Sequence, residues 1–499
     1  MTDRAHAGDP TGDVTDRRRR GADRGFPAPP SRPADLLTRL VLVIGLGVWI
    51  VNALILLLGA APLNPDEAQY AIAARDMIAG SEPRWFYLSR GMNVVASVGI
   101  LAGESELALR IVPFVLGIGF VLAVWQLART TFGSATAAWV VAVVAGTRSF
   151  VRLSVELLSD LPATTHLLAA MAVIAAELPR DEGPRWRVVI AAPLLAAAFY
   201  LRYASCVPIA IIGVSWVALG WRGIVRRPAP VIATAALFLV LFVPHAIMAD
   251  HATGSPLGIL LESRLVPANE YAGKGLVTYF TTNPFAYYGR LTPPIMIIGL
   301  LVLRRDRRVV FLWIVAAVST IAIGFMSDAQ VRYVMLGTAL LTMLGVDVIR
   351  RWIVARPRRF REVLVACATA ATVLACLLMV RDQRRIPGGR VKRMTSTLAA
   401  AAAIRQDAAG RACHVVANYF TQVAWYGHCP SARYSPSDAI AHGELSYVVD
   451  DPGAPWRPDF QELPGQPRMI LDVPGVIRVA RLDPVAPAPS QVLVPPAVP

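Results

Sequence analysis

Long apolar runs separated by short polar stretches fill most of the sequence between residues 36 and 380. Several of them reach the roughly 20 residues that an α-helix needs to cross a bilayer. They do not alternate polar and apolar residues, as the strands of a membrane β-barrel do. The pattern therefore predicts a polytopic α-helical membrane protein. The eleven predicted spans are 36–60, 107–128, 134–150, 161–178, 187–204, 206–220, 230–248, 291–303, 309–326, 331–349 and 362–380.

The composition agrees with this pattern. The chain has 499 residues, of which 55% are hydrophobic, and its mean hydropathy is +0.50, so it is more apolar than a soluble domain. A net charge of +15 would suit a nucleic-acid partner. The arginines, however, lie in short loops between apolar runs, where the positive-inside rule places them, and we expect no nucleic acid. The first apolar run is too long for the core of a signal peptide, so we expect an uncleaved first span.

The basic loops predict the orientation in the membrane. With the N-terminus in the cytoplasm, every concentrated basic loop falls on the cytoplasmic side, whereas an error of one span would divide these loops between both sides. The loops are 178–187, 221–229, 304–308 and 350–361. We therefore predict a multi-pass protein of the plasma membrane. The large segments 61–106 and 249–290, and the chain from residue 381 onward, then lie outside.

Four domains follow from this topology. Residues 1–34 are polar and rich in Arg and Pro, which predicts a disordered cytoplasmic N-terminus. Residues 35–380 form the transmembrane domain. Residues 381–482 are predicted to form a small extracytoplasmic α/β domain, in which CHVVAN, LSYVVD and VIRVARL are strands and YFTQVAWYG is a short helix. Residues 483–499 form a Pro-rich tail.

Two of the five cysteines, Cys413 and Cys429, fall in the predicted outer domain. On an oxidising side of the membrane they can pair and close a loop of about 17 residues, which would stabilise the domain by ~3 kcal/mol. Two free thiols are the alternative.

The stretch LNPDEAQYA places two carboxylates directly after the first span. Asn64 is a favourable N-cap, and Glu67 stands where a capping box requires it. The stretch therefore predicts a short amphipathic helix that ends at Gly80 and lies along the outer membrane surface. A helix start explains Glu67 well, but it explains Asp66 only in part, since one good cap suffices.

Further polar and aromatic residues collect on the same predicted side. Ionisable groups at membrane depth are costly and usually mark a site or an ion pair. Each one alone could be a structural pair or an exposed loop residue. Together they predict an outward cavity, with carboxylates to handle a hydroxyl and arginines to hold a phosphate. These residues are Tyr70, Glu156, Asp160, Arg202, Tyr203, His245, Asp250, His251, Asp328, Arg332 and Tyr333.

Five motifs, in their order and spacing, resemble the GT-C membrane glycosyltransferases. The resemblance is to the branch with the protein O-mannosyltransferases and the bacterial lipid A aminoarabinose transferase, namely glycosyltransferase family 39 and its relatives. It covers roughly residues 36–350, and the motifs are DEAQYAIAARDM, GESELALRIVPFVLG, VELLSDLPA, AFYLRYAS and DAQVRYVMLGTALL. The resemblance implies a GT-C-like fold of about eleven transmembrane helices with an outer juxtamembrane helix.

Two positions depart from the pattern of many relatives. Gln69 stands where many have an arginine, three residues after Asp66. The stretch SRGMNVV stands where many have a basic residue followed by two prolines, so Arg90 is the candidate replacement for that basic residue.

The resemblance implies transfer of a sugar from a polyprenyl-phosphate donor to an acceptor on the outer side, with Asp66 as the catalytic carboxylate. The acceptor would be an envelope glycan, a lipid or a protein. A carboxylate that removes the acceptor's proton typically contributes about 10²–10⁴-fold to the rate. The leaving phosphate needs positive charge rather than a Gly-rich nucleotide loop, and the sequence contains no such motif. A single displacement would invert the anomeric centre.

The remaining candidates have predicted roles in this mechanism. Tyr70 and Tyr333 could stack on a sugar, although most tyrosines at such positions are interface aromatics. The predicted phosphate partners are Arg202, Arg332, Arg90 and Lys274. The residues predicted to shape the acceptor side or to bind a divalent cation, Mg²⁺ or Mn²⁺, are Glu67, Glu156 and Asp160, and Asp66 could join such a metal site.

Three alternative functions stay open at this point. A secondary transporter or flippase of lipid-linked sugars would have similar spans and loops, but it should contain internal repeats, and the sequence has no clear one. A polymerase or ligase of preassembled glycans would use similar chemistry. A non-catalytic scaffold would recruit a partner through its outer domain.

Overall fold

The computed structural model describes residues 32–483 with several gaps. The residues outside the description are 1–31, 60, 82–84, 86–87, 263–270, 282–283, 302–303, 326–329, 384–385, 418–419, 430, 434–444, 453–457, 462, 464–466 and 484–499. The predicted disordered N-terminus and Pro-rich tail lie almost entirely outside the described residues, as does Asp328.

Helices coincide with all eleven predicted spans. In the described part of the chain, seven helices are long and apolar enough to cross a membrane, so the protein is a multi-pass membrane protein. These seven are α2 (Arg32–Leu58), α5 (Glu106–Phe132), α10 (Cys206–Arg226), α11 (Ala229–Thr253), α16 (Arg307–Gly324), α17 (Met335–Val354) and α18 (Arg358–Gln383). The other four predicted spans are shorter or less apolar helices, namely α6 (Ser134–Ala145), α8 (Asp160–Glu177), α9 (Ala191–Leu201) and α15 (Thr292–Leu301).

Two breaks in these helices shape one end of the bundle. The predicted span 134–150 is interrupted, because α6 ends before Gly146 and the short helix α7 (Arg148–Leu153) follows. The chain also breaks just before Cys206: Arg202 is extended, with φ −158° and ψ 109°, and the 3₁₀ helix η2 (Tyr203–Ser205) leads into α10. An extended residue between two helices directs its side chain differently from its helical neighbours, and this places Arg202.

The core of the bundle surrounds α8. Nearly every residue of α8 is buried, because α5, α9 and α17 pack around it. Beside it, α15 and α17 cross at two glycines. A Cβ on Gly299 would lie 2.2 Å from the Leu341 carbonyl oxygen, and one on Gly345 would lie 2.0 Å from that of Ile295. Small residues permit this close approach of two membrane helices.

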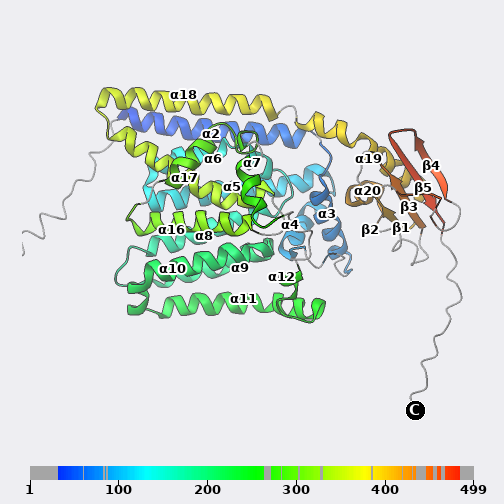
Figure 1. Cartoon of the computed structure of the whole chain (residues 1–499), viewed down its shortest axis with the longest axis horizontal. Helices are drawn as coiled ribbons and strands as arrows, with labels where there is room; N and C mark the ends of the chain where they lie inside the picture. Colours follow the sequence, from blue (N-terminus) through cyan, green and yellow to red (C-terminus); the bar gives the residue numbers. More distant parts are fainter. Residues whose placement is uncertain are drawn as a thin grey trace, which may run out of the picture.

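The basic loops meet at one end of the bundle, to the left in Figure 1. Asp181 connects three of them: its carbonyl oxygen accepts a hydrogen bond from Arg226 at 2.8 Å, and its carboxylate pairs with Arg307 at 3.1 Å. Next to them, Arg308 donates to the carbonyl oxygen of Thr130 at 2.8 Å. The loops therefore share one end, as the charge distribution predicts.

The opposite end carries the short helices and the C-terminal domain (Figure 1). The short helices there include α3 (Pro65–Ile78), α4 (Arg90–Leu101) and α12 (Gly258–Glu262). Helix α4 was not among the predicted spans. Helix α18 is followed by α19 (Ile386–Ala408), which carries the chain from the bundle to the sheet.

The C-terminal domain is a five-stranded mixed sheet with the order β2-β1-β3-β5-β4. The parallel part contains β1 (Cys413–Val416), β2 (Ser431–Arg433) and β3 (Leu445–Asp450), and the antiparallel part adds β5 (Ile477–Leu482) and β4 (Arg468–Val473). Parallel strands need a crossover, and α20 (Phe420–Gly427) provides it between β1 and β2. The three predicted strands and the short helix are confirmed.

Cys413 and Cys429 form a disulfide, as one of the two sequence readings predicts. Cys413 begins β1 and Cys429 follows the end of α20. The bond therefore fixes the end of this helix to the sheet.

Helix α3 differs from the expected surface helix. Its capping box is confirmed: the Asn64 side chain accepts from the Glu67 N–H, and the Glu67 side chain accepts from the Asn64 N–H. Eight of its 14 residues are buried, however, because α4 packs against it from the bundle and α20 from the C-terminal domain. The helix sequence alone could not show that a distant domain covers it.

Candidate active site

A cavity of about 820 Å³ lies at the end of the bundle opposite the basic loops. Pockets that bind small molecules typically have volumes of about 300–1,000 Å³. The walls come from α3, the segments before α4 and α8, the break between α9 and α10, α12 and the short helix that precedes α17. Seven predicted site residues line it, namely Asp66, Tyr70, Asp160, Arg202, Tyr203, Arg332 and Tyr333.

Asp66 faces the cavity from the first turn of α3. The Asn64 cap starts this helix at Pro65, which sets the direction of the Asp66 side chain. Arg332 lies opposite, with its Nη2 2.6 Å from Asp66 Oδ2. The Asp66 side chain is 43% exposed and that of Arg332 is 17% exposed. The Asp66 carboxylate is exposed enough to contact a substrate, and the largely buried Arg332 beside it holds that carboxylate in place.

Asp160 connects the two arginines of the cavity. It is the first residue of α8, and its side chain is only 4% exposed. Its carboxylate pairs with Arg202, and its Oδ2 lies 3.7 Å from Arg332 Nε. Two guanidinium groups so close together repel each other unless a counter-charge lies between them. Asp160 therefore allows both cations to stand at the same cavity wall.

The ring of Tyr333 completes this cluster. The Cζ of Arg202 lies 4.2 Å from the ring centroid, and that of Arg332 lies 5.4 Å away. Cations over an aromatic face are stabilised by the ring's quadrupole. Arg332 and Tyr333 belong to the 3₁₀ helix η4 (Val331–Val334), which precedes α17. Each arginine is placed by a short 3₁₀ helix. Arg202 directly precedes the one before α10, and Arg332 lies within the one before α17.

Glu67, although adjacent to Asp66, does not line the cavity. Its side chain is fully buried, and each of its carboxylate oxygens lies 3.2 Å from a guanidinium nitrogen of Arg110. The Leu157 N–H also donates to it. Neighbouring residues on an α-helix point about 100° apart, so Glu67 faces the protein interior while Asp66 faces the cavity.

Three other predicted site residues also lie away from the cavity wall. Glu156 is buried and pairs with Arg152 at 2.8 Å. Arg90 begins α4, where its N–H donates to the Tyr203 hydroxyl and its side chain is exposed. Lys274 begins the helix α13 (Lys274–Thr281) and does not line the cavity.

The histidines considered earlier do not line the cavity either. His245 is buried in α11 against the rings of Phe199 and Tyr203. Asp250 and His251 are exposed near the end of the same helix. Although the sequence predicts these three residues to lie on the same side of the membrane as the site, they do not line the cavity.

Sequence reasoning missed the apolar wall of the cavity. It comes from Val207, Leu257, Ile259, Leu260, Leu261 and Phe325, and Gln69, Ser89 and Ser159 add polar groups. Apolar residues in an apolar chain give no signal of a site. Gln69 did give a signal of the site, because a residue three positions after Asp66 on a helix lies on the same face as Asp66.

The carboxylates of the site do not fit a metal ion. Among the described residues, no group of three or more His, Cys, Asp or Glu side chains is arranged to hold one. Of the predicted ligands, Glu67 lies away from the cavity, while Asp66 and Asp160 both face Arg332. The mechanism below therefore uses no metal, and the predicted Mg²⁺ or Mn²⁺ stays a prediction.

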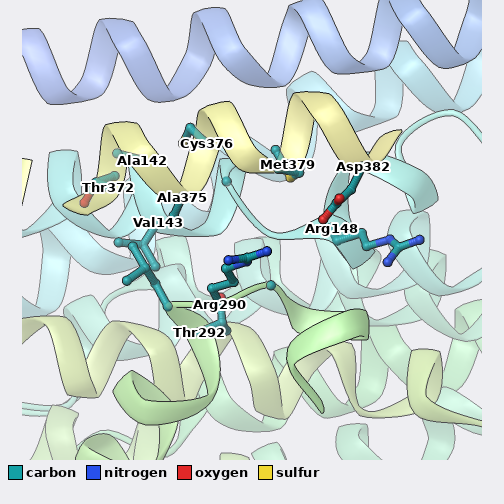
Figure 2. A pocket seen from close by; sticks show the side chains of 13 residues that line it. Ala142, Val143, Arg148, Arg290, Thr292, Thr372, Ala375, Cys376, Met379 and Asp382 are labelled. Carbon is teal, nitrogen blue, oxygen red and sulfur yellow. The ribbon is translucent and has the colours of Figure 1, made fainter. Parts of the chain in front are cut away.

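A second cavity, shown in Figure 2, lies between α6, α15 and α18. Charged side chains of Arg148, Arg290 and Asp382 surround it, together with the buried Cys376. Its volume is about 50 Å³, against about 820 Å³ for the first cavity. It has room for a few waters at most, so it is not a sugar site.

Solved structures share the architecture of this chain. ArnT from Cupriavidus metallidurans bound to undecaprenyl phosphate superimposes with a TM-score of 0.65 and 12% identity, over 89% of this chain and 97% of that chain. The chain has the GT-C fold. The oligosaccharyltransferase AglB from Archaeoglobus fulgidus, solved in complex with an inhibitory peptide and a dolichol-phosphate, also superimposes. Its TM-score is 0.54 at 14% identity, over 82% of this chain and 69% of that chain.

The resemblance to the GT-C glycosyltransferases that five motifs indicated is thus confirmed at the level of the fold. Residues 94–248 also match the family described as dolichyl-phosphate-mannose-protein mannosyltransferase. No curated protein matches the sequence. The matched segment of the GT-C chain contains Asp160 and Arg202 but neither Asp66 nor Arg332. The cavity therefore joins residues inside this segment to residues on both sides of it.

Proposed function

We propose that this protein is an integral membrane glycosyltransferase. It moves a sugar from a polyprenyl-phosphate donor to an envelope glycan, lipid or protein acceptor on the extracytoplasmic side. The observation that carries the proposal is the cluster of Asp66, Arg332, Asp160 and Arg202 at the wall of a large cavity in a GT-C fold. Solved relatives in fold support a lipid-linked donor, since ArnT binds undecaprenyl phosphate and AglB binds dolichol-phosphate.

The positions of the basic loops and of one disulfide support an extracytoplasmic location for the cavity. The basic loops lie at the end of the bundle opposite the cavity, and positive loops face the cytoplasm. The disulfide between Cys413 and Cys429 lies in the C-terminal domain, at the cavity end. Disulfides persist in oxidising compartments. Both observations support a cavity on the extracytoplasmic face and an N-terminus in the cytoplasm.

The two arginines suit the donor phosphate. A guanidinium group forms paired, charge-assisted hydrogen bonds with phosphate oxygens. Arg202 and Arg332 stand together at the wall, and apolar residues such as Leu257, Leu260 and Phe325 line the same cavity. In this proposal the arginines hold the phosphate, and the apolar wall takes the first part of the prenyl chain.

Asp66 is the proposed general base. An acceptor hydroxyl oxygen attacks the anomeric carbon and transfers its proton to the Asp66 carboxylate. The bond from the anomeric carbon to the phosphate oxygen breaks, and polyprenyl phosphate leaves with the electron pair, stabilised by Arg202 and Arg332. A single displacement inverts the anomeric centre.

The exposures of the two carboxylates fit these roles. Asp160 is 4% exposed and lies between the arginines, whereas Asp66 is 43% exposed and, among the described ion pairs, contacts only Arg332. An arriving phosphate competes with Asp66 for Arg332 but cannot displace the buried Asp160 as easily. Donor binding would thereby release the Asp66 carboxylate toward the acceptor.

The test uses purified protein in nanodiscs, a panel of polyprenyl-phosphate sugars and envelope extract as acceptor. We expect release of free polyprenyl phosphate with one donor, and a loss of about 10² or more in Asp66→Asn. The matched control is Asp181→Asn, an exposed acid paired with Arg307 at the basic end, which should keep full activity. Full activity of Asp66→Asn would exclude it as the base.

A transporter or flippase of lipid-linked sugars is the second candidate, because the spans and the basic loops suit it equally. It would move the donor across the bilayer without consuming it. Translocation of labelled donor with no release of polyprenyl phosphate from any member of the panel would favour it over a transferase.

A further inference from the structure

The segment that leads into α3 is held by the C-terminal domain. Gln422 Nε2 donates to the Leu63 carbonyl oxygen at 2.7 Å, and the Leu63 N–H donates to the Tyr426 hydroxyl at 2.8 Å. Thr421 Oγ1 donates to the Pro65 carbonyl oxygen at 3.0 Å. All three side chains belong to α20. The main chain on either side of the Asn64 cap thus finds partners more than 350 residues away in sequence.

These contacts are shielded from water. Gln422 is 3% exposed and Thr421 is 5% exposed. Burial raises the pKa of Tyr426, whose hydroxyl also bonds Glu106, the first residue of α5. A buried carbonyl or N–H group that loses its partner is not compensated by solvent. Helix α20 therefore fixes the start of α3 relative to the bundle.

The rest of α20 is anchored on both sides. The guanidinium of Arg75, in the last turn of α3, lies 4.4 Å from the Trp425 ring centroid. The Cys413–Cys429 disulfide closes the loop that contains α20, and the Cys429 N–H bonds the Ala424 carbonyl oxygen at 3.1 Å. The sheet therefore fixes the position of α20, and α20 in turn fixes the position of α3.

Asp66 directly follows the clamped residues. It is the second residue of α3, and its carboxylate reaches Arg332 across the cavity. A small shift of residues 63–65 moves it relative to the donor site. Misplacement of a reacting group by about 1 Å can cost about 10²-fold in rate. None of Thr421, Gln422 or Tyr426 lines the cavity.

We propose that α20 is a clamp for the catalytic carboxylate, and that Thr421, Gln422 and Tyr426 are positioning residues for Asp66. The inference rests on the proposed transferase function. The C-terminal domain then has a role in catalysis without touching the substrate. Loss of the clamp lowers kcat, while the donor KM, which depends on the cavity wall, stays nearly constant.

The experiment measures kcat and the donor KM for polyprenyl phosphate release in nanodiscs. In the Thr421→Val, Gln422→Met double variant, both side chains keep their approximate size and lose the hydrogen-bond donor. We expect kcat to fall about 10-fold or more, with the donor KM within about twofold of wild type. Thr421→Ser keeps the hydroxyl and should keep wild-type kcat.

Two further variants guard against loss of folding. Tyr426→Phe keeps the ring and removes only the hydroxyl, so a fall in kcat at an unchanged melting temperature supports the clamp. Thr395→Val removes an exposed hydroxyl on α19 that bonds the Val391 carbonyl, and it should leave kcat unchanged.

The outcomes separate the two proposals. Wild-type kcat in both the double variant and Tyr426→Phe overturns the clamp alone. A rise in donor KM at constant kcat also overturns it, because α20 would then act in binding. An inactive wild type with every donor overturns the transferase function, and the clamp with it.

Discussion

Among the described residues, each end of the bundle has a buried carboxylate, Asp347 or Asp160, that contacts two arginines. At the basic end, Asp347 is 2% exposed and lies 2.9 Å from Arg304 and 2.8 Å from Arg351. At the opposite end, Asp160 is 4% exposed and faces Arg202 and Arg332. The chemistry of the two clusters is the same. The Asp160 cluster, however, adjoins a large cavity and an exposed second carboxylate, so access rather than composition distinguishes the site.

The same contrast occurs within one turn of α3. Asp66 and Glu67 are neighbours, and each faces an arginine. Asp66 is 43% exposed at the cavity, whereas the Glu67 side chain is fully buried against Arg110. A closed pair has no room for a substrate and serves the fold. The following predictions test this division between open and closed pairs.

Glu67→Gln should have the largest effect on stability. It leaves the buried Arg110, which is 3% exposed, without a counter-charge, and breaking a buried pair in this way costs about 3–5 kcal/mol. We expect a corresponding loss of unfolding free energy in a denaturant titration in micelles. Transfer per folded molecule should change little. A large loss of activity with unchanged stability would instead place Glu67 at the chemistry.

Arg332→Gln should have the largest effect on transfer after Asp66→Asn. Removing a group that stabilises charge in the transition state typically costs about 10²–10³-fold in kcat. Arg307→Gln, at an exposed pair of the basic end, is the matched control and should keep wild-type kcat. The measurement is polyprenyl phosphate release at saturating donor. Equal kcat values for Arg332→Gln and Arg307→Gln would show that arginines at the two ends of the bundle do not differ in their effect on transfer.

Asp347→Asn should weaken the fold moderately and leave transfer intact. Its partners Arg304 and Arg351 are 31% and 51% exposed, so they can be solvated after the change. Loss of a charged hydrogen-bond partner then costs about 1–3 kcal/mol. The checks are the melting temperature and the activity per folded molecule. A selective loss of activity would show that the basic end takes part in the reaction.

Tyr333→Leu should have the smallest effect of the four. It removes the ring over which Arg202 and Arg332 lie, and such cation–π contacts are worth about 0.5–2 kcal/mol. We expect a modest increase in the donor KM. Tyr333→Phe keeps the ring and should therefore lie closer to wild type. A larger effect of Phe than of Leu would contradict this interpretation.

Much of the architecture could be predicted from the sequence. The apolar runs predicted eleven helices, the arginine loops predicted which turns share an end, and Asn64 with Glu67 predicted the start of α3. These features depend on local chemistry: hydropathy, charge and capping. The pairing of Cys413 with Cys429 was one of two open readings, because a disulfide needs spatial proximity that spacing alone does not guarantee.

The sequence by itself determined which elements form and which of their ends carry charge, since both follow from residues close together in the chain. Only the tertiary structure decided which charged groups meet. Asp66, Asp160, Arg202 and Arg332 come from four separate elements, and the rotation and packing of those elements bring them to one cavity. The same packing buried Glu67 and placed α20 over the start of α3, because helices that are distant in sequence compete for the same faces.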